Sequence, residues 1–381
     1  MKLHTVPITM WDFSWIERQW SGAGFEDWDL ALRELTERGY EAVRIDAFPH
    51  LLAEDPERVW TLLPVWYSND WGSPYINQVK LYPALVKFIR KCQEYGVKVG
   101  LSSWYREDQD NIRMKIKTPE KMAENWIAVL KLLQQEGVLD QVLYLDLCNE
   151  WPGNLWAPFF ENDPPDAGWS AWNTKASMDY MRRAVECIRE AFPEIPLCFS
   201  MDNITMEHYK QNQLDFFDLI EHHIWMAKLN GNEFYNLVGN AKNGRFSDEP
   251  YHLLVKNAYD VYQQRPEYWK ELLRQGIRDL AQVSVEQGLP LATTECWGIV
   301  DYKDFPMLRW DWIQDLCQLG LETALDTGRW VMAATSNFAA PQFVGMWRDV
   351  QWHQKLTSRM KETVLDENLV NSRLKKRLLL P

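Results

Sequence analysis

Residues 143–152 read Leu-Tyr-Leu-Asp-Leu-Cys-Asn-Glu-Trp-Pro, a run of apolar and β-prone residues that ends in an Asn-Glu pair. We predict a buried strand here, because a Trp-Pro-Gly turn follows the pair and stops regular structure. A carboxylate at the end of a buried strand points out of the sheet and into a cleft. If the fold is a parallel barrel, Glu150 lies at the face where active sites are built, and we interpret it as a catalytic acid.

Strand-like and helix-like segments alternate along the whole chain. The strand-like segments are residues 5–10, 41–45, 97–104, 141–148, 196–201, 219–225, 289–294 and 330–336. The helix-like segments are residues 28–38, 79–95, 119–135, 174–192, 268–287 and 308–327, with a final helix at about 352–365 and then a basic, fraying tail. This alternation predicts a parallel sheet with helical crossovers, and eight repeats predict a closed (β/α)8 TIM barrel.

The lengths of the connections support the barrel. Helix-to-strand connections are short and often contain glycine, whereas the strand-to-helix connections at 46–78, 151–173 and 226–267 are long and hold much of the Trp. Long loops on one face and tight turns on the other are typical of this barrel. A doubly wound open sheet is the alternative, but no glycine-rich phosphate fingerprint follows the first strand. We expect one domain over residues 1–381, with the barrel at about 5–350 and a C-terminal helix and tail at about 351–381.

The composition favours a neutral ligand. The net charge of −13 argues against nucleic acid and against an anionic membrane surface as partners. The 21 Trp residues suit a protein that grips sugar rings, although each can equally pack the barrel. The six Cys residues are scattered without zinc-type spacing. Because we find neither a signal peptide nor roughly 18 consecutive apolar residues, we expect a cytoplasmic protein without membrane association.

A second carboxylate occupies a matching position. Residues 289–298 read Leu-Pro-Leu-Ala-Thr-Thr-Glu-Cys-Trp-Gly, again a buried strand that ends in Glu and is broken by Trp-Gly. Glu150 and Glu295 end the fourth and seventh predicted strands, which face each other across the barrel mouth. Glycoside cleavage needs two carboxyl groups, about 5–5.5 Å apart for retention and about 6.5–9.5 Å apart for inversion. The alternative for either residue alone is a salt-bridged strand end.

Together these residues resemble the site of clan A glycoside hydrolases, the cellulase-like (β/α)8 enzymes typified by family 5. The resemblance implies that Glu150 is the general acid/base and Glu295 the nucleophile. It also implies that Asn149 hydrogen-bonds the substrate 2-hydroxyl, and that Arg44, near the end of the second strand, pairs with the nucleophile. A neighbouring guanidinium drives a carboxylate toward its charged form. An ordinary ion pair is the alternative for Arg44.

The sixth strand departs from the family pattern. Family 5 enzymes carry His-x-Tyr here, with the Tyr touching the nucleophile, whereas this chain has His223-Ile-Trp225. Because side chains alternate along a strand, His223 and Trp225 share one face and His222 lies on the other. The His pair could also indicate metal binding. With no third convergent His or Cys at ligand spacing, we predict no metal and no cofactor.

Further candidates for sugar contacts lie at or just beyond strand ends. They are Trp11, Trp104, Trp151, Asn203, Trp297 and Asn337, each with local packing or capping as its alternative role. We therefore predict a retaining β-glycoside hydrolase with a carbohydrate substrate, either β-linked oligosaccharides or glycosides. Exo-action on imported material follows from the expected location. The main alternative is a non-catalytic sugar-binding protein on the same scaffold, and a weaker one is a barrel enzyme of another chemistry, such as an aldolase or a metal-dependent hydrolase.

Overall fold

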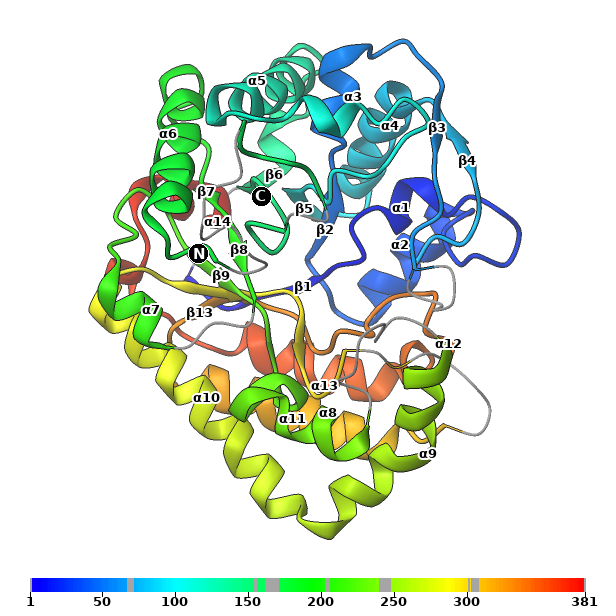
Figure 1. Ribbon diagram of the computed structural model, residues 1–381, viewed down its shortest axis with the longest axis vertical. Helices are drawn as coiled ribbons and strands as arrows, with labels where there is room; N and C mark the ends of the chain where they lie inside the picture. Colours follow the sequence, from blue (N-terminus) through cyan, green and yellow to red (C-terminus); the bar gives the residue numbers. More distant parts are fainter. Residues whose placement is uncertain are drawn as a thin grey trace.

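The computed structural model is a closed parallel barrel surrounded by helices (Figure 1). It describes residues 2–66, 72–153, 156–161, 171–202, 206–239, 248–300, 302 and 308–379. The strands follow the order β7-β6-β5-β2-β1-β13-β11-β9-β8. Because β7 (Leu197–Cys198) and β8 (Ser200–Met201) are two halves of one predicted strand, the two ends of this order meet and the barrel closes. The predicted (β/α)8 TIM barrel is confirmed.

The other strands run in parallel, so their carboxyl ends meet at one mouth. They are β1 (Val6–Thr9), β2 (Ala42–Asp46), β5 (Lys98–Ser102), β6 (Val142–Asp146), β9 (Ile220–His222), β11 (Leu291–Thr293) and β13 (Trp330–Ala333). Beyond β9 and β11, the short strands β10 (Ile224–Trp225) and β12 (Cys296–Trp297) pair with each other. Inside the barrel Tyr144 fills the space beside Gly100, where a Cβ would lie 2.5 Å from the Tyr144 ring. A larger residue at position 100 therefore does not fit.

Helices cover the outer surface of the barrel. The principal ones are α2 (Trp28–Glu37), α4 (Leu81–Glu94), α5 (Pro119–Gln135), α6 (Lys175–Ala191), α10 (Pro266–Gln287), α11 (Asp311–Asp326) and α13 (Val350–Lys361). Side-chain caps fix several of their starts: Thr118 accepts from Lys121 N and Thr174 accepts from Ser177 N. Each helix buries one apolar stripe against the strands. In the described part of the chain, no helix has the length and apolar character to cross a membrane.

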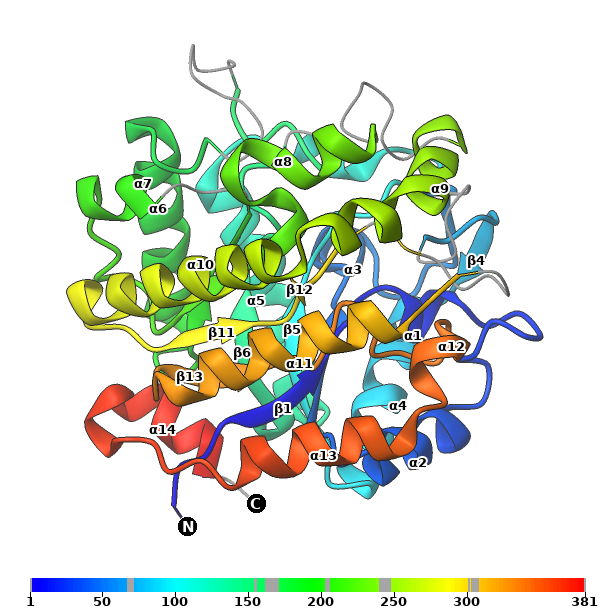
Figure 2. The ribbon, with the colours of Figure 1, turned by 90° about the horizontal axis from the view of Figure 1, so that it is seen from below.

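The long connections at the mouth contain ordered elements that sequence periodicity did not predict. They are α1 (Ser14–Glu17), α3 (Pro49–Glu54), the antiparallel hairpin of β3 (Trp60–Leu62) and β4 (Asn77–Val79), α7 (Met206–Gln211), α8 (Leu229–Val238), α9 (Asp248–Gln264) and α12 (Val344–Trp347). Figure 2 shows α8 and α9 at the end of the molecule opposite the two termini. Apart from α9, which has 17 residues, these elements are short and depend on packing against the barrel rather than on their own propensity.

The C-terminal extension also differs from the expected fraying tail. Residues Ser372–Leu379 form helix α14, which buries Leu374 against the barrel end opposite the mouth. Asn371 Nδ2 and Arg373 Nε both donate to Asp218 Oδ1, at 2.5 Å and 2.8 Å. The predicted tail was therefore wrong as a description of these residues, because one apolar side chain and a buried carboxylate hold the segment in place.

Candidate active site

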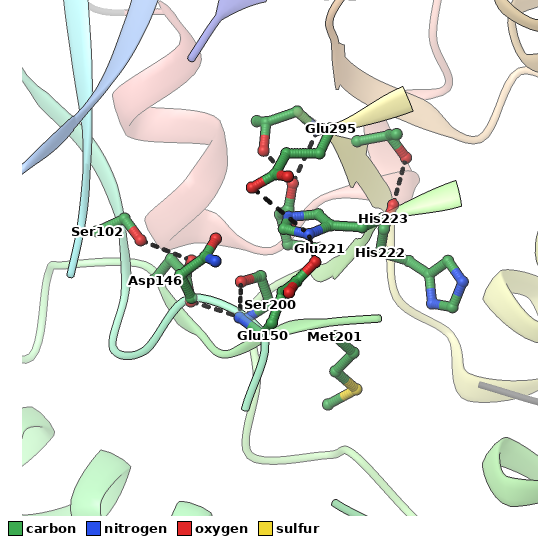
Figure 3. A network of polar contacts seen from close by, with 12 residues as sticks. Ser102, Asp146, Glu150, Ser200, Met201, Glu221, His222, His223 and Glu295 are labelled. Carbon is green, nitrogen blue, oxygen red and sulfur yellow. Dashed lines mark hydrogen bonds and ion pairs between the residues drawn. The ribbon is translucent and has the colours of Figure 1, made fainter. Parts of the chain in front are cut away.

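The carboxyl ends of the strands bring Glu150 and Glu295 together (Figure 3). Glu150 follows β6, and Glu295 lies between β11 and β12. A carboxylate oxygen of one residue lies within 4.8 Å of a carboxylate oxygen of the other. Their side chains are only 10% and 6% exposed. Glu150 adopts a φ of 51°, a left-handed conformation that costs free energy for a residue with a side chain and is concentrated at functional sites.

Arg44, a fully buried residue of β2, connects Glu295 to its neighbours. Its Nη2 donates to Glu295 Oε1 at 2.9 Å and to Asn149 Oδ1 at 2.8 Å. Its Nε donates to Asp12 Oδ1 at 2.8 Å. Because the guanidinium is planar and its donors point in fixed directions, these three bonds hold Glu295, Asn149 and Asp12 in one arrangement.

His223 lies between the two glutamates, and Glu221 supports it from the other side (Figure 3). Its Nδ1 is 3.1 Å from Glu150 Oε1 and 3.7 Å from Glu295 Oε1. Its Nε2 is 2.9 Å from Glu221 Oε2, a charge contact rather than a well-aligned hydrogen bond. The other oxygen of Glu221 accepts from Thr294 N at 2.8 Å and from Thr294 Oγ1 at 2.6 Å. His223 is thus fixed between three carboxylates.

These contacts shift the proton equilibria of the site. Burial alone would lower the pKa of His223, but Glu221 and Glu295 raise it well above its usual value, which favours the protonated ring. Burial alone would raise the pKa of Glu221, but His223 lowers it to about 2. Burial raises the pKa of Glu295, and Glu150 raises it further, whereas His223 and Arg44 oppose this. Two carboxyl groups this close favour a state in which they share one proton.

Glu150, His223 and Glu295 also lie close enough to form a three-ligand metal set. A histidine must be neutral to bind a metal, because the lone pair of a ring nitrogen forms the bond. His223 Nδ1 faces Glu150, whereas Nε2 faces Glu221 and, at 3.2 Å, Arg44 Nη1. The guanidinium of Arg44 and the raised pKa of His223 therefore disfavour a metal ion between these residues.

Asn149 offers a hydrogen-bond donor at the site. Its Oδ1 accepts from Arg44, and its buried Nδ2 has no hydrogen-bond partner among the described residues. Buried polar atoms are nearly always paired. The amide group of Asn149 can therefore donate to a hydroxyl of a bound ligand.

Two of the predicted aromatic residues, Trp104 and Trp11, make hydrogen bonds through their indole N–H groups. Trp104 Nε1 donates to Asp12, and the Trp104 ring makes edge contacts with Trp66 and Trp156 at centroid distances of 5.1 Å. Trp11 Nε1 donates to the backbone oxygen of Asn337 at 2.8 Å. The side-chain Oδ1 of Asn337 is buried and has no hydrogen-bond partner in the described ranges. Aromatic rings and polar groups therefore alternate around this part of the mouth.

Trp151 and Trp297 are not part of this group, because both rings are fully buried between the barrel and its helices. Trp151 packs on Tyr180 of α6, with ring centroids 4.7 Å apart. Trp297 lies against Gly320 of α11, where a Cβ would be 2.8 Å from the Trp297 Cβ. In both cases the structure shows the packing role that was the alternative.

Trp225 and Asn203 complete the predicted set. Trp225 is buried beside His223, with ring centroids 5.7 Å apart, and its Nε1 has no hydrogen-bond partner in the part of the chain that the structure describes. Asn203 lies outside the described residues. Sequence reasoning missed Glu221, although strand alternation places residue 221 on the same face as His223 and Trp225 and could have indicated it.

A family model described as sugar-binding cellulase-like matches residues 8–361. A crystal structure from Parabacteroides distasonis, provisionally described as a glycoside hydrolase, is 51% identical over 99% of each chain, with a TM-score of 0.95. A structure of a family 5, subfamily 18 protein from Bifidobacterium longum is 12% identical over 97% of this chain and 85% of that one, with a TM-score of 0.52. A variant of the Bifidobacterium protein in complex with mannosyl-β-1,4-N-acetylglucosamine gives a TM-score of 0.51 at 13% identity, over 97% and 84% of the chains. At these low identities, the last two matches show a shared fold alone. No curated protein sequence matches the chain.

Proposed function

Because the chain belongs to the sugar-binding cellulase-like family, we propose that it is a retaining β-glycoside hydrolase acting on β-linked oligosaccharides or glycosides. The observation that carries this proposal is the closeness of the two glutamates, which have carboxylate oxygens within 4.8 Å of each other. Retaining enzymes hold their carboxyl groups about 5–5.5 Å apart, whereas inverting enzymes need about 6.5–9.5 Å to admit a water molecule between carboxylate and sugar.

The reaction takes place in two displacements at the anomeric carbon. In the first, Glu295 attacks this carbon, the bond to the leaving oxygen breaks, and Glu150 gives its proton to that oxygen. The resulting ester on Glu295 carries no negative charge. In the second, Glu150 removes a proton from water, the water oxygen attacks the same carbon, and Glu295 leaves as a carboxylate. Two inversions give overall retention.

The charges around the pair support these roles. Glu295 accepts a hydrogen bond from Arg44 Nη2 and lies 3.7 Å from the His223 imidazolium, so its ionised form is stabilised. We assign the shared proton to Glu150, as the first displacement requires, because the hydrogen bond from Arg44 favours the ionised form of Glu295. When Glu295 becomes an ester, its negative charge disappears, and Glu150 can lose its proton more easily.

The sugar contacts follow from the unpaired groups at the mouth. We assign Asn149 Nδ2 as the donor to the 2-hydroxyl of the sugar that Glu295 attacks. Trp11, Trp104 and Asn337 are placed to contact the same ring, and Arg44 and His223 position the carboxylates. The proposed partner of the protein is thus a carbohydrate, bound without metal or cofactor.

Three further properties are part of the proposal. The low exposure of both glutamates suits exo-action in a pocket rather than in an open groove. All six Cys residues are unpaired and five are buried, which suits a reducing cytoplasmic location. The packing of α14 on the barrel suits a single domain over residues 1–381.

A labelling experiment tests the assignment. The protein is incubated with 2-deoxy-2-fluoro-β-glycosyl fluorides of the gluco, galacto and manno series, and the labelled peptide is identified by mass spectrometry. We expect the label on Glu295. The Glu295→Gln variant should lose turnover of aryl β-glycosides, while Glu150→Ala should retain activity on substrates whose leaving group needs no acid. Sugar binding without turnover in the wild type would show a non-catalytic sugar-binding protein instead.

A further inference from the structure

A buried charged cluster lies beside Glu150, at and just beyond the carboxyl ends of β8 and β10. Asp202 directly follows β8, Trp225 ends β10, and Lys228 ends the short 3-10 helix η3 (Met226–Lys228). Lys228 Nζ donates to Asp202 Oδ2 at 2.6 Å and lies 4.0 Å from the centre of the Trp225 ring. The side chains of Lys228 and Asp202 are 6% and 2% exposed. We refer to Asp202, Trp225 and Lys228 as the lysine cluster.

The lysine cluster has hydrogen-bonding capacity that the described residues do not use. Asp202 Oδ1 and Trp225 Nε1 are both buried and have no hydrogen-bond partner there. The ammonium group of Lys228 has three N–H donors, of which one is directed at Asp202. An unpaired buried polar atom costs about 1–3 kcal/mol, so two such atoms beside the ammonium group of Lys228 indicate a site for a polar ligand.

The position of the lysine cluster indicates which part of a substrate it faces. Glu150 N donates to Ser200 Oγ at 3.0 Å, so the end of β8, which Asp202 follows, lies beside Glu150. The strand that carries Glu150 and the strand that leads to Asp202 are neighbours in the barrel. Arg44, Asn149 and Glu295 hold the sugar that is attacked, and Glu150 gives its proton to the leaving oxygen. Groups beside Glu150 therefore face the part of the substrate that leaves with that oxygen.

We propose that Asp202, Trp225 and Lys228 form a subsite for the leaving group and bind neighbouring hydroxyls of a sugar. One hydroxyl donates to Asp202 Oδ1, and the next accepts from Lys228 Nζ or Trp225 Nε1. Because the carboxylate and the ammonium cancel in charge, the subsite suits a neutral sugar rather than a uronic acid. This inference rests on the proposed function, and it makes an oligosaccharide, rather than a simple aryl glycoside, the natural substrate.

The experiment uses the trapped glycosyl-enzyme. The wild type is inactivated with the 2-deoxy-2-fluoro-β-glycosyl fluoride that labels it, excess reagent is removed, and the recovery of activity is followed in buffer alone and with cellobiose or N-acetylglucosamine. A sugar in the leaving-group subsite accepts the trapped glycosyl group and speeds recovery. The ratio of the two recovery rates measures this subsite, because both routes use Glu150 as the base.

We expect an accepting sugar to speed recovery of the wild type. Asp202→Asn and Lys228→Met should reduce the acceleration roughly ten- to hundredfold, the range for a hydrogen bond to a charged group. The double variant Asp202→Asn/Lys228→Met leaves no unpaired buried charge and provides a folded alternative if a single variant fails to fold. Lys175→Met is the control, because Lys175 forms an exposed pair with its side chain 87% exposed. An unchanged rate ratio in the variants, or no acceleration in the wild type, would overturn the subsite, whereas failure of every fluoride to label the wild type would refute the proposed function itself.

Discussion

Replacing Glu221 by Gln should remove the charge that keeps His223 protonated while preserving the shape of the side chain. The two charged groups are 2.9 Å apart and fully buried. At an effective dielectric constant of about 20, unit charges at this distance attract by about 6 kcal/mol. Loss of one partner of a buried ion pair typically lowers the free energy of unfolding by about 3–5 kcal/mol. Thr294 can still donate to the Gln oxygen, so the change acts mainly through His223.

The loss of stability should depend on pH in a defined direction. The pKa of His223 in the folded protein is raised well above the unfolded value of about 6.5. The stabilisation is therefore complete below about pH 6.5 and decreases as the pH rises toward the folded pKa. In this range the wild type loses about 1.4 kcal/mol per pH unit through this residue. The pKa of Glu221 is about 2, so the pair remains ionised down to mildly acidic pH.

Urea unfolding followed by Trp fluorescence measures the difference between wild type and variant. The difference in the free energy of unfolding should be largest near pH 6 and become smaller at each higher pH. Buried groups that lie away from Glu221 and His223 titrate alike in both proteins and cancel. Glu207→Gln serves as the control, because that side chain is 61% exposed and pairs only with Lys210 in the described ranges. A difference that stays constant from pH 6 to pH 9 would refute the imidazolium assignment.

Three other perturbations test separate parts of the reasoning. Arg44→Met removes a cation that lowers the pKa of Glu295, so that pKa should rise. The acidic limb of the pH–activity profile should then move to higher pH, and an unmoved limb would show that Arg44 does not act on Glu295. Gly320→Ala places a Cβ 2.8 Å from the Trp297 Cβ, and the free energy of unfolding should fall by about 1–3 kcal/mol in urea titrations; unchanged stability means that α11 can shift freely. Dialysis against EDTA should leave turnover intact, whereas a loss restored by a divalent cation would show that Glu150, His223 and Glu295 bind metal.

The barrel and the pair of glutamates could both be predicted from the sequence, because the strand segments recur regularly and each glutamate follows the end of one. Strand segments recur eight times, and the order of the strands in the closed barrel follows their order in the chain. Glu150 and Glu295 each follow a buried strand, so the topology alone brings them to one mouth. The loop elements could not be predicted from the sequence, because the α8 helix and the β3–β4 hairpin are short and depend on tertiary packing.

The predicted sugar contacts of Trp151 and Trp297 differ from the packing in the structure for a local reason. Each follows a glutamate at a point where the regular strand has ended, so strand alternation no longer indicates the direction of the side chain. Glu150 has a positive φ, and the next residue turns toward α6. β11 ends at Thr293 and the chain resumes as β12 at Cys296, which places Trp297 against α11. A Trp ring suits a sugar and a helix equally well, so residue type could not decide between them.

The substitution of Trp225 for the expected tyrosine can be understood from the charges around Glu295. In the resembling enzymes a Tyr hydroxyl touches the nucleophile, and an indole in this position has only an N–H to offer. In this chain the indole N–H makes no hydrogen bond within the described residues, and the ring face supports Lys228. Glu295 instead accepts from Arg44 Nη2 at 2.9 Å and lies 3.7 Å from His223 Nδ1. Glu221 and Glu295 raise the pKa of this histidine, whereas burial alone would lower it. In the proposed mechanism, Arg44 and His223 thus stabilise Glu295 where a hydroxyl is missing, and the Trp225 ring packs against Lys228 in the lysine cluster.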